Sequence, residues 1–239
     1  MRVSVIIPAR DEEAELPATL ASVADALDGA GVEGETVVVD DASTDRTAEI
    51  ARESGATVVA VALHNIAAVR NAGAAAAAGD LLVFLAADTR LPAETLRAAV
   101  REAAGGAVGG GATLTWDRRP NPASRFCSWL FLLVWQGVLG YACGCFVFAR
   151  RADFEAVGGF DPAYFAAEER FLTEALRRRG RFAIVRPPVV TSARKMRLFS
   201  TGRLIAIAVP ALFFGRHRLK RREGLELLYD APREPATAR

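Results

Sequence analysis

Apolar residues in the first hundred positions form short β-branched runs, which alternate with longer segments where apolar side chains recur every three or four residues. A short unbroken run predicts a buried strand, and the longer spacing predicts an amphipathic helix. Strands are predicted at residues 3–7, 36–39, 57–61 and 81–85. Helices are predicted at residues 13–27, 43–54, 66–78 and 91–103. This alternation is typical of a doubly wound α/β fold, so we expect a single Rossmann-like domain with a central, mostly parallel sheet.

The second half of the chain has a different pattern, dominated by an uncharged apolar stretch at residues 126–149. The stretch is long enough to span a bilayer. Because Gln136, three glycines and a β-rich end interrupt it, we favour a buried helix followed by a buried strand. A membrane span is the alternative. The other predicted elements are a strand near 144–148, a helix at 167–179 and a strand-like segment at 183–185.

A further apolar segment, residues 204–214, is too short to span a bilayer and is followed by five basic residues. It suits a helix lying on an anionic membrane surface. It suits equally well a core or homodimer contact with a solvated basic end. We therefore expect a C-terminal helical extension and tail at residues 201–239.

Composition excludes several classes of protein. The chain has 239 residues, of which 51% are hydrophobic, and this excludes disorder and a disulfide scaffold. The formal net charge of +2 hides an asymmetry, because residues 175–222 contain 14 Arg or Lys side chains and no Asp or Glu. A nucleic-acid binder usually has a general basic excess with interleaved aromatic residues, so we expect no nucleic-acid partner. The local basic surplus points instead to phosphates or to an anionic membrane surface.

The cysteines and the N-terminus bear on the cellular compartment. Cys127, Cys143 and Cys145 form no CxxC pair, which favours free thiols in a reducing compartment. The N-terminal apolar run is too short for a signal peptide. We therefore expect a cytoplasmic location, with peripheral attachment to the inner face of the cell membrane as the variant that the basic segment suggests.

Acidic residues follow three of the predicted strands: Asp11-Glu12 the first, Asp40-Asp41 the second and Asp88 the fourth. Ligands of parallel α/β sheets bind beyond the carboxyl ends of the strands. Carboxylates there can accept hydrogen bonds from a base or ribose, or hold Mg²⁺ or Mn²⁺. The loop after the first strand lacks the glycines of a GxGxxG motif, which disfavours a dinucleotide site.

Basic residues supply the complementary charge. Arg70 lies near the start of a predicted helix, and Arg194-Lys195 follows the last predicted strand. Guanidinium and ammonium groups suit a diphosphate. Acidic and basic residues together predict a site for a nucleoside diphosphate.

Five segments, taken in order, resemble glycosyltransferase family 2: VSVIIPARDEE (3–13), VVVDDASTDRT (37–47), AAVRNAGAAAAAGDLLVFLAADTRLP (67–92), ARRADFEAVGGFD (149–161) and AAEERFLTEALRRRGRF (166–182). The resemblance covers about residues 1–200 and implies the A-type glycosyltransferase (GT-A) fold, a single α/β domain. It implies a nucleotide-sugar-binding half at 1–104 and an acceptor-binding half at 105–200. Family members are mostly metal-dependent, inverting transferases that use nucleotide-diphosphate sugars.

The resemblance also implies roles for individual residues. The nucleotide-binding residues would be Pro8, Ala9, Asp11, Asp41, Arg70 and Ala87. The family's Asp-x-Asp motif is Ala86-Ala87-Asp88 here, so Asp88 would be the metal ligand and the first acid is missing. The family's catalytic base falls on Glu169, with Glu168 as the close alternative. The diphosphate-binding residues would be Ser192, Arg194 and Lys195.

The resemblance, together with the acidic and basic residues, implies a metal-assisted, inverting glycosyltransferase with a UDP- or GDP-linked donor, Mn²⁺ or Mg²⁺, and a glutamate base. The acceptor stays open. A lipid-linked acceptor fits the apolar region and the basic tail, and a soluble acceptor fits nearly as well. Because the first acid of the metal motif is absent, the alternative is a weakly active or inactive homologue that binds nucleotide sugars.

Overall fold

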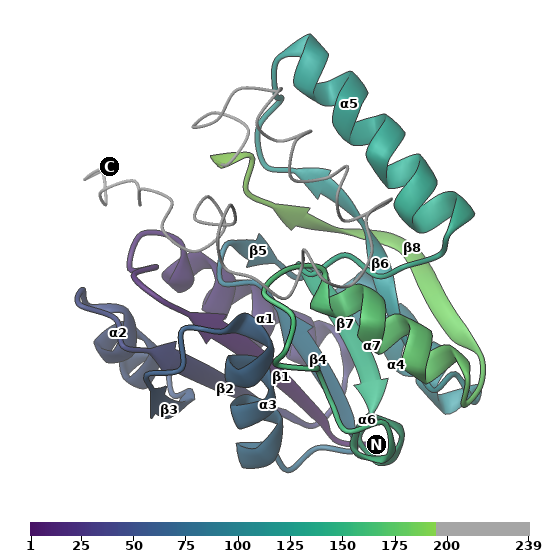
Figure 1. Ribbon diagram of the computed structural model, residues 1–239. Helices are drawn as coiled ribbons and strands as arrows, with labels where there is room; N and C mark the ends of the chain where they lie inside the picture. The colour runs from purple at the N-terminus through teal and green to yellow at the C-terminus, as the bar shows by residue number, and fades with distance from the viewer. Residues whose placement is uncertain (195–239) are drawn as a thin grey trace.

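The computed structural model of the protein describes residues 1–194 (Figure 1). Within them the strands form one eight-stranded sheet in the order β3-β2-β1-β4-β7-β6-β8-β5. The strands are β1 (Val3–Ala9), β2 (Gly34–Asp41), β3 (Thr57–Val61), β4 (Leu81–Leu85), β5 (Thr89–Arg90), β6 (Gly109–Trp116), β7 (Phe146–Arg150) and β8 (Phe182–Thr191). The helices are α1 (Leu16–Ala30), α2 (Thr47–Glu53), α3 (Ile66–Ala76), α4 (Ala93–Ala104), α5 (Pro122–Leu132), the π-helical segment η1 (Leu133–Val138), α6 (Arg151–Ala156) and α7 (Glu168–Arg177).

The sheet is mixed but mostly parallel. Strands β3, β2, β1 and β4 run parallel to one another, and β8 runs parallel to β6. Strand β7 is antiparallel to both β4 and β6. Every residue of β1 and β4 is buried, which explains their unbroken apolar sequences. The expected α/β fold is confirmed, and all eight elements predicted in the first hundred residues are present.

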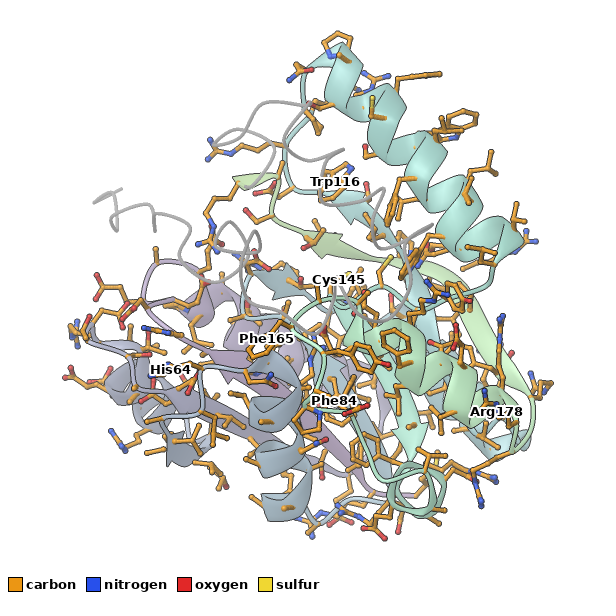
Figure 2. All side chains as sticks on the ribbon, viewed as in Figure 1. His64, Phe84, Trp116, Cys145, Phe165 and Arg178 are labelled. Carbon is orange, nitrogen blue, oxygen red and sulfur yellow. The ribbon has the colours of Figure 1, made fainter. Side chains whose placement is uncertain are left out.

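Each face of the sheet has its own apolar core, because successive side chains of a strand point to opposite faces. The first core contains Val5 and Ile7 of β1 together with residues of α1 and α4. The second contains Ile6 together with residues of α3, α6 and α7. Helices therefore cover both faces (Figure 1), and the side chains that Figure 2 shows at the centre of the sheet include Phe84. This layering leaves the carboxyl ends of β1, β2 and β4 as the place where loops can build a site.

The hydrophobic pattern does not predict β6, which begins with three consecutive glycines, Gly109–Gly111. A Cβ at Gly110 would collide with the backbone oxygen of Ala183 in β8 and with the ring of Phe148 in β7. Glycine therefore permits the close approach of β6 to its two neighbours. Because glycine has no side chain, three consecutive glycines give no hydrophobic pattern, and this strand is not predicted from the sequence.

The apolar stretch 126–149 divides, as expected, into a helical part and a strand. The helical part ends at Val138, and β7 begins at Phe146, so no single helix runs through the stretch as a membrane span would require. The expected burial of the helical part is wrong, because several of its large apolar side chains are exposed. Within residues 1–194 no helix is long and apolar enough to cross a membrane.

The remaining expectations concern the end of the chain. Strand β8 extends the predicted segment 183–185 to ten residues, and the predicted helix 167–179 is α7. The apolar segment 204–214, the extension 201–239 and Lys195 lie outside the described residues.

Candidate functional site

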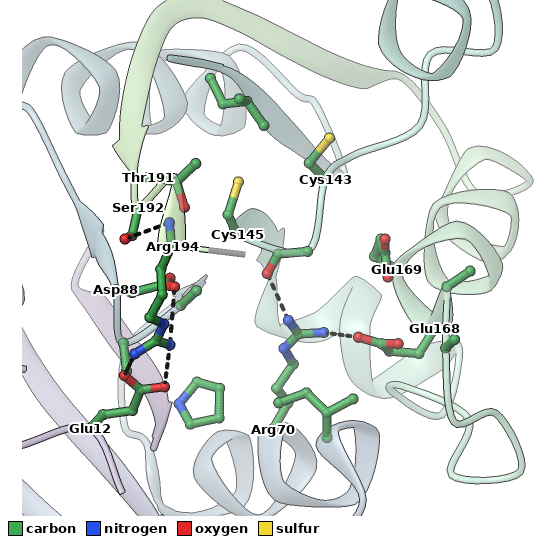
Figure 3. A pocket seen from close by; sticks show the side chains of 18 of the residues that line it. Glu12, Arg70, Asp88, Cys143, Cys145, Glu168, Glu169, Thr191, Ser192 and Arg194 are labelled. Carbon is green, nitrogen blue, oxygen red and sulfur yellow. Dashed lines mark hydrogen bonds and ion pairs between the residues drawn. The ribbon is translucent and has the colours of Figure 1, made fainter. Parts of the chain in front are cut away.

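A cavity of about 570 Å³ lies at the carboxyl ends of the parallel strands β1, β2 and β4 (Figure 3). The starts of α3 and α7, the turn before β7, helix α5 and the end of β8 complete its wall. Ligands of parallel α/β sheets bind at this edge. The cavity therefore coincides with the place where the sequence predicts a site.

Most of the expected site residues line this cavity: Pro8, Ala9, Asp41, Arg70, Ala87, Asp88, Glu168, Glu169, Ser192 and Arg194. Asp11 is not among the lining residues. Its neighbour Glu12 lines the cavity instead, although the resemblance gives it no role.

Asp11 joins two loops at the cavity's rim. Its carboxylate oxygen Oδ1 accepts hydrogen bonds from the backbone amide of Thr44 (2.7 Å) and from the Thr44 hydroxyl (3.1 Å). The amide of Asp11 donates to the Ser43 hydroxyl (3.0 Å). The loop after β1 is thereby tied to the loop after β2, which positions the groups on either side of Asp11.

Asp41 ends β2 and organises the loop that precedes α3. Its carboxylate accepts hydrogen bonds from the backbone amides of Leu63 (2.7 Å) and His64 (3.0 Å). Asp41 nevertheless contributes to the cavity wall. The neighbouring Asp40 has a buried carboxylate oxygen, Oδ1, without a hydrogen-bond partner among the described residues.

Backbone strain gathers at this edge of the sheet. Within residues 1–194, the non-glycine residues with positive φ are Asp11, Ala42, His64 and Ala167, at 49° to 57°. They occupy the loops after β1, β2 and β3 and the residue before α7. Left-handed backbone at non-glycine residues costs free energy and is concentrated at functional sites. The loops around the cavity are therefore the strained part of the fold.

Strand β8 carries Arg194 to the acidic side of the cavity. The guanidinium donates two hydrogen bonds to the carboxylate of Glu12, at 2.9 and 3.0 Å. Its Nη2 atom also lies 3.6 Å from a carboxylate oxygen of Asp88. The backbone amide of Ser192 donates to the carbonyl oxygen of Asp88 (3.1 Å), so β8 and the loop after β4 are held together.

A second guanidinium, that of Arg70 in α3, is paired on the opposite side of the cavity (Figure 3). It donates to the Glu168 carboxylate and to the carbonyl oxygen of Gly144 (2.7 Å). The side chains of both charged residues are only 5% and 7% exposed. The hydrogen bonds of Arg70 are thus made within the protein, and its guanidinium places a positive charge at the cavity wall.

Among the carboxyl groups of residues 1–194, that of Glu169 has the pKa furthest from its ordinary value. Burial and the adjacent charge of Glu168 raise the pKa of Glu169 from 4.5 to about 8. Gly144 stands beside it, and a Cβ there would lie 3.6 Å from the carboxyl group of Glu169. A carboxyl group with a raised pKa in a cavity is suited to proton transfer near neutral pH.

The acidic end of the cavity suits a divalent cation only together with a phosphate ligand. Among residues 1–194, no three His, Cys, Asp or Glu side chains are close enough to hold a metal by themselves. The cavity wall nevertheless has five carboxyl groups against three guanidinium groups, and Asp88 contributes one of the carboxyls. Mg²⁺ commonly binds through one or two protein carboxylates and takes its other ligands from phosphates and water. The residues present fit that arrangement.

The other end of the cavity is apolar. Trp116 of β6 and Phe131, Leu132 and Trp135 of α5 and η1 form part of its wall. The indole N–H of Trp135 donates to the carbonyl oxygen of Ala142 (2.8 Å), and its ring stacks on that of Phe131. Phe165 also borders the cavity. The sequence did not indicate this wall, because an unbroken apolar run hides which side of its helix faces inward.

Comparison with protein families gives one match along most of the described chain. The sequence model described as "Glycosyl transferase family 2" matches residues 4–158. The matched range includes Asp88 and the strands β1, β2 and β4, whose carboxyl ends border the cavity, and it ends before α7 and β8.

Two curated relatives illustrate the sequence similarity. The chain is 38% identical over 173 residues to an undecaprenyl-phosphate 4-deoxy-4-formamido-L-arabinose transferase of Pseudomonas paraeruginosa, which covers 65% of this chain and 49% of that protein. It is 43% identical over 96 residues to a 4,4'-diaponeurosporenoate glycosyltransferase of Staphylococcus haemolyticus, which covers 37% of this chain and 24% of that protein. The chain thus spans about half the length, or less, of these relatives.

Solved structures share the fold at lower sequence identity. Residues 1–349 of Staphylococcus aureus TarS superpose with a TM-score of 0.60 at 19% identity, covering 97% of this chain and 72% of that one. Glucosyl-3-phosphoglycerate synthase from Mycobacterium tuberculosis, in complex with Mn²⁺, UDP and glucosyl-3-phosphoglycerate, superposes with a TM-score of 0.62 at 20% identity. It covers 90% of this chain and 81% of that one. The GT-A fold expected from the sequence is therefore confirmed.

Proposed function

Because the chain belongs to glycosyltransferase family 2, we propose that it transfers a sugar from a UDP- or GDP-linked donor to an amphipathic, lipid-linked acceptor, with inversion at the anomeric carbon. The observation that carries this proposal is the composition of the cavity. Asp88, Glu169 and the apolar side of α5 border one space. The charged donor would fit the polar end of this space, and an acceptor with an apolar body would fit the apolar end.

The donor belongs at the strand ends. The nucleoside would lie along Pro8, Ala9 and Asp41, which border the cavity where β1 and β2 end. Support comes from the synthase with the same fold, whose structure contains UDP and Mn²⁺. A divalent cation on Asp88 would neutralise charge that develops on the departing diphosphate. Ser192 and Arg194 border the same part of the cavity, and Arg194 adds a positive charge beside Asp88.

Glu169 is the better placed of the two candidate bases. The carboxylate of Glu168 already accepts a hydrogen bond from Arg70. The pKa of Glu169, by contrast, is raised to about 8 by burial and by the charge of Glu168. In the proposed step the acceptor oxygen attacks the anomeric carbon and forms the new glycosidic bond. The bond from that carbon to the diphosphate oxygen breaks, its electron pair leaves with the nucleoside diphosphate, and the proton of the attacking acceptor group, a hydroxyl or a monoprotonated phosphate, passes to Glu169. The displacement inverts the anomeric carbon.

The acceptor is proposed to be lipid-linked on two grounds. The wall formed by α5 and η1 is apolar, and the names of both curated relatives specify a long apolar molecule, undecaprenyl phosphate or diaponeurosporenoate. An apolar wall excludes water and offers favourable burial to an isoprenoid or similar chain. A cytoplasmic location and a homodimer both stay predictions from the sequence.

One observation favours a second candidate function. Ala86 stands where the family has the first acid of its metal motif, so a homologue that binds nucleotide sugars without transferring them is the alternative. Binding and turnover must therefore be measured separately.

The experiment is a thermal-shift screen of the full chain with UDP- and GDP-sugars, with and without MnCl₂, followed by assays of donor hydrolysis and of transfer to undecaprenyl phosphate. A donor at about 100 times its Kd should raise the free energy of unfolding by about 2.7 kcal/mol, and only with the cation. Turnover of that donor supports the transferase. Donor binding without hydrolysis or transfer supports the alternative, and stabilisation by no donor contradicts both.

A further inference from the structure

The outer side of α5 and η1 has an exposed apolar stripe. Its members are Phe126, Trp129, Leu130, Leu133 and Val138, with exposed fractions of 62%, 57%, 46%, 46% and 74%. The first four follow the spacing of one helix face, and Val138 continues the exposure through η1. Elsewhere in residues 1–194 only Met1 and Leu63 are large hydrophobic residues with comparable exposure. Exposed apolar side chains in one cluster mark an interaction surface.

The stripe belongs to a firmly held helix. Asn121 caps its start by accepting a hydrogen bond from the amide of Ser124 (2.9 Å). The buried Trp135 anchors its end through the carbonyl oxygen of Ala142, and the side-chain amide of Gln136 donates to the carbonyl oxygen of Ala112 (2.8 Å). The helix therefore presents the stripe while its opposite side lines the cavity.

The charge of the residues around α5 indicates which kind of partner the stripe binds. Residues 118–138 contain no Asp or Glu. The exposed Arg118 and Arg119 lie in the segment before α5, and the exposed Arg125 lies in its first turn. Figure 1 shows α5 at an edge of the molecule, away from the helices that cover the sheet. Helices that rest in the membrane surface combine a basic polar side with Trp, Phe and Leu on the other. Trp is favoured there because its ring has an apolar body and a polar N–H.

We propose that α5 and η1 dock on an anionic phospholipid bilayer, with the apolar stripe among the acyl chains and the three arginines at the lipid phosphates. The helix lies along the surface and does not cross it. This inference concerns a surface different from the segment 204–214 that the sequence suggests, and it does not depend on the proposed donor or acceptor.

The experiment is cosedimentation of the full chain with vesicles of phosphatidylcholine, with or without phosphatidylglycerol. The double variant Leu130→Ser/Leu133→Ser is compared with Leu63→Ser, because all three leucines are 46% exposed. Affinity for the anionic vesicles should fall roughly tenfold or more in the double variant, since binding scales with inserted apolar area. It should be unchanged in Leu63→Ser. Circular dichroism verifies that both variants are folded.

A second measurement uses the wild-type protein, in which the apolar stripe is intact. Vesicles with brominated acyl chains should quench the fluorescence of the full chain, and the quenching should be largely lost in Trp129→Phe, which retains an apolar ring at the same place. Equal vesicle binding by the wild type and the double variant would overturn the proposal, as would equal binding to neutral and anionic vesicles. A dimer in light scattering that the double variant converts to a monomer, without vesicle binding by the wild type, assigns the stripe to a second copy of the chain and also overturns it.

Discussion

The ion pair between Arg194 and Glu12 joins residues that are 182 positions apart and closes the cavity on its acidic side. Both side chains are less than 10% exposed, and both oxygens of the carboxylate are used. The pair therefore fixes the end of β8 against the loop after β1, with Asp88 3.6 Å from the same guanidinium. One buried contact thus sets the geometry of residues that we propose for binding the diphosphate and the metal.

The buried position of this pair predicts a large effect of removing one charge. Glu12→Gln should lower the free energy of unfolding by about 3 kcal/mol, because it leaves the buried charge of Arg194 without a full partner. Urea denaturation measures this. The matched control is Glu49→Gln, which breaks the Arg46–Glu49 pair of the same 2.9 Å length on the surface. The control should leave the urea midpoint unchanged; equal effects of both variants would show that burial of the Glu12 pair is irrelevant.

The raised pKa of Glu169 predicts a pH-dependent stability. The native protein keeps a proton on this carboxyl group up to pH about 8, whereas the unfolded chain releases it near pH 4.5. The free energy of unfolding should therefore fall as the pH rises from about 4.5 to 8, by on the order of 1 to 4 kcal/mol. Glu169→Gln should remove this slope and gain stability relative to the wild type at pH 8. Denaturation curves between pH 5 and 9 test it, and an unchanged slope in the variant would place the perturbed group elsewhere.

The same pKa predicts how the rate of the proposed sugar transfer depends on pH. If Glu169 accepts the acceptor's proton, kcat/KM should rise with pH and level off above about 8, where the carboxylate is ionised. Glu169→Gln should lower the rate by roughly 10² to 10⁴. The measurement is a pH–rate profile with the donor found in the thermal-shift screen. A variant with the wild-type rate would exclude Glu169 as the base.

The predicted metal motif has one carboxylate, that of Asp88. We therefore expect removal of this carboxylate and addition of a second one to have opposite effects on the affinity for Mn²⁺. Asp88→Asn should weaken the Mn²⁺-dependent stabilisation by the donor, with an apparent affinity for Mn²⁺ lower by roughly tenfold or more. Ala86→Asp restores a second carboxylate to the loop and should raise that affinity. Titration of Mn²⁺ in thermal-shift assays at fixed donor measures both, with Asp25→Asn on the exposed side of α1 as the control. Wild-type behaviour of Asp88→Asn would remove Asp88 from the metal site.

The glycines of β6 predict a purely steric effect. Gly110→Ala should destabilise the fold by about 1–3 kcal/mol or more, since its Cβ would meet Ala183 and Phe148. Gly137→Ala in η1 is the control, because its Cβ would make only an ordinary contact with Leu133 at 3.5 Å. Thermal unfolding should show a lower Tm for the first variant and an equal or higher Tm for the second.

The N-terminal half of the fold is predictable largely because its central strands, β1 and β4, are buried on both faces. Val3–Ala9 and Leu81–Leu85 appear in the sequence as unbroken apolar runs for that reason. The carboxyl ends of parallel strands meet at one edge, so the acidic residues behind them predict the position of the site. Local pattern therefore suffices for this half.

The finer geometry of the site depends on contacts that no local pattern contains. Asp11 and Glu12 are adjacent acids, but only Glu12 lines the cavity, whereas Asp11 has left-handed backbone (φ 51°) and bonds to Thr44. The partner of Glu12 is Arg194, and that of Glu168 is Arg70, 98 positions away. Likewise, an uninterrupted apolar run gives no indication of which side of α5 is packed and which is exposed. Contacts between residues that are far apart in the sequence determine these features of the site.

The two-sided character of α5 has a consequence for how substrates arrive. A lipid-linked acceptor held in the same bilayer leaflet as the stripe would reach the apolar end of the cavity by lateral diffusion past Phe131 and Trp135, without leaving the lipid phase. The water-soluble donor would enter at the strand ends. The encounter with the acceptor then becomes a search in two dimensions, governed by the number of acceptor molecules per area of membrane and not by their concentration in water.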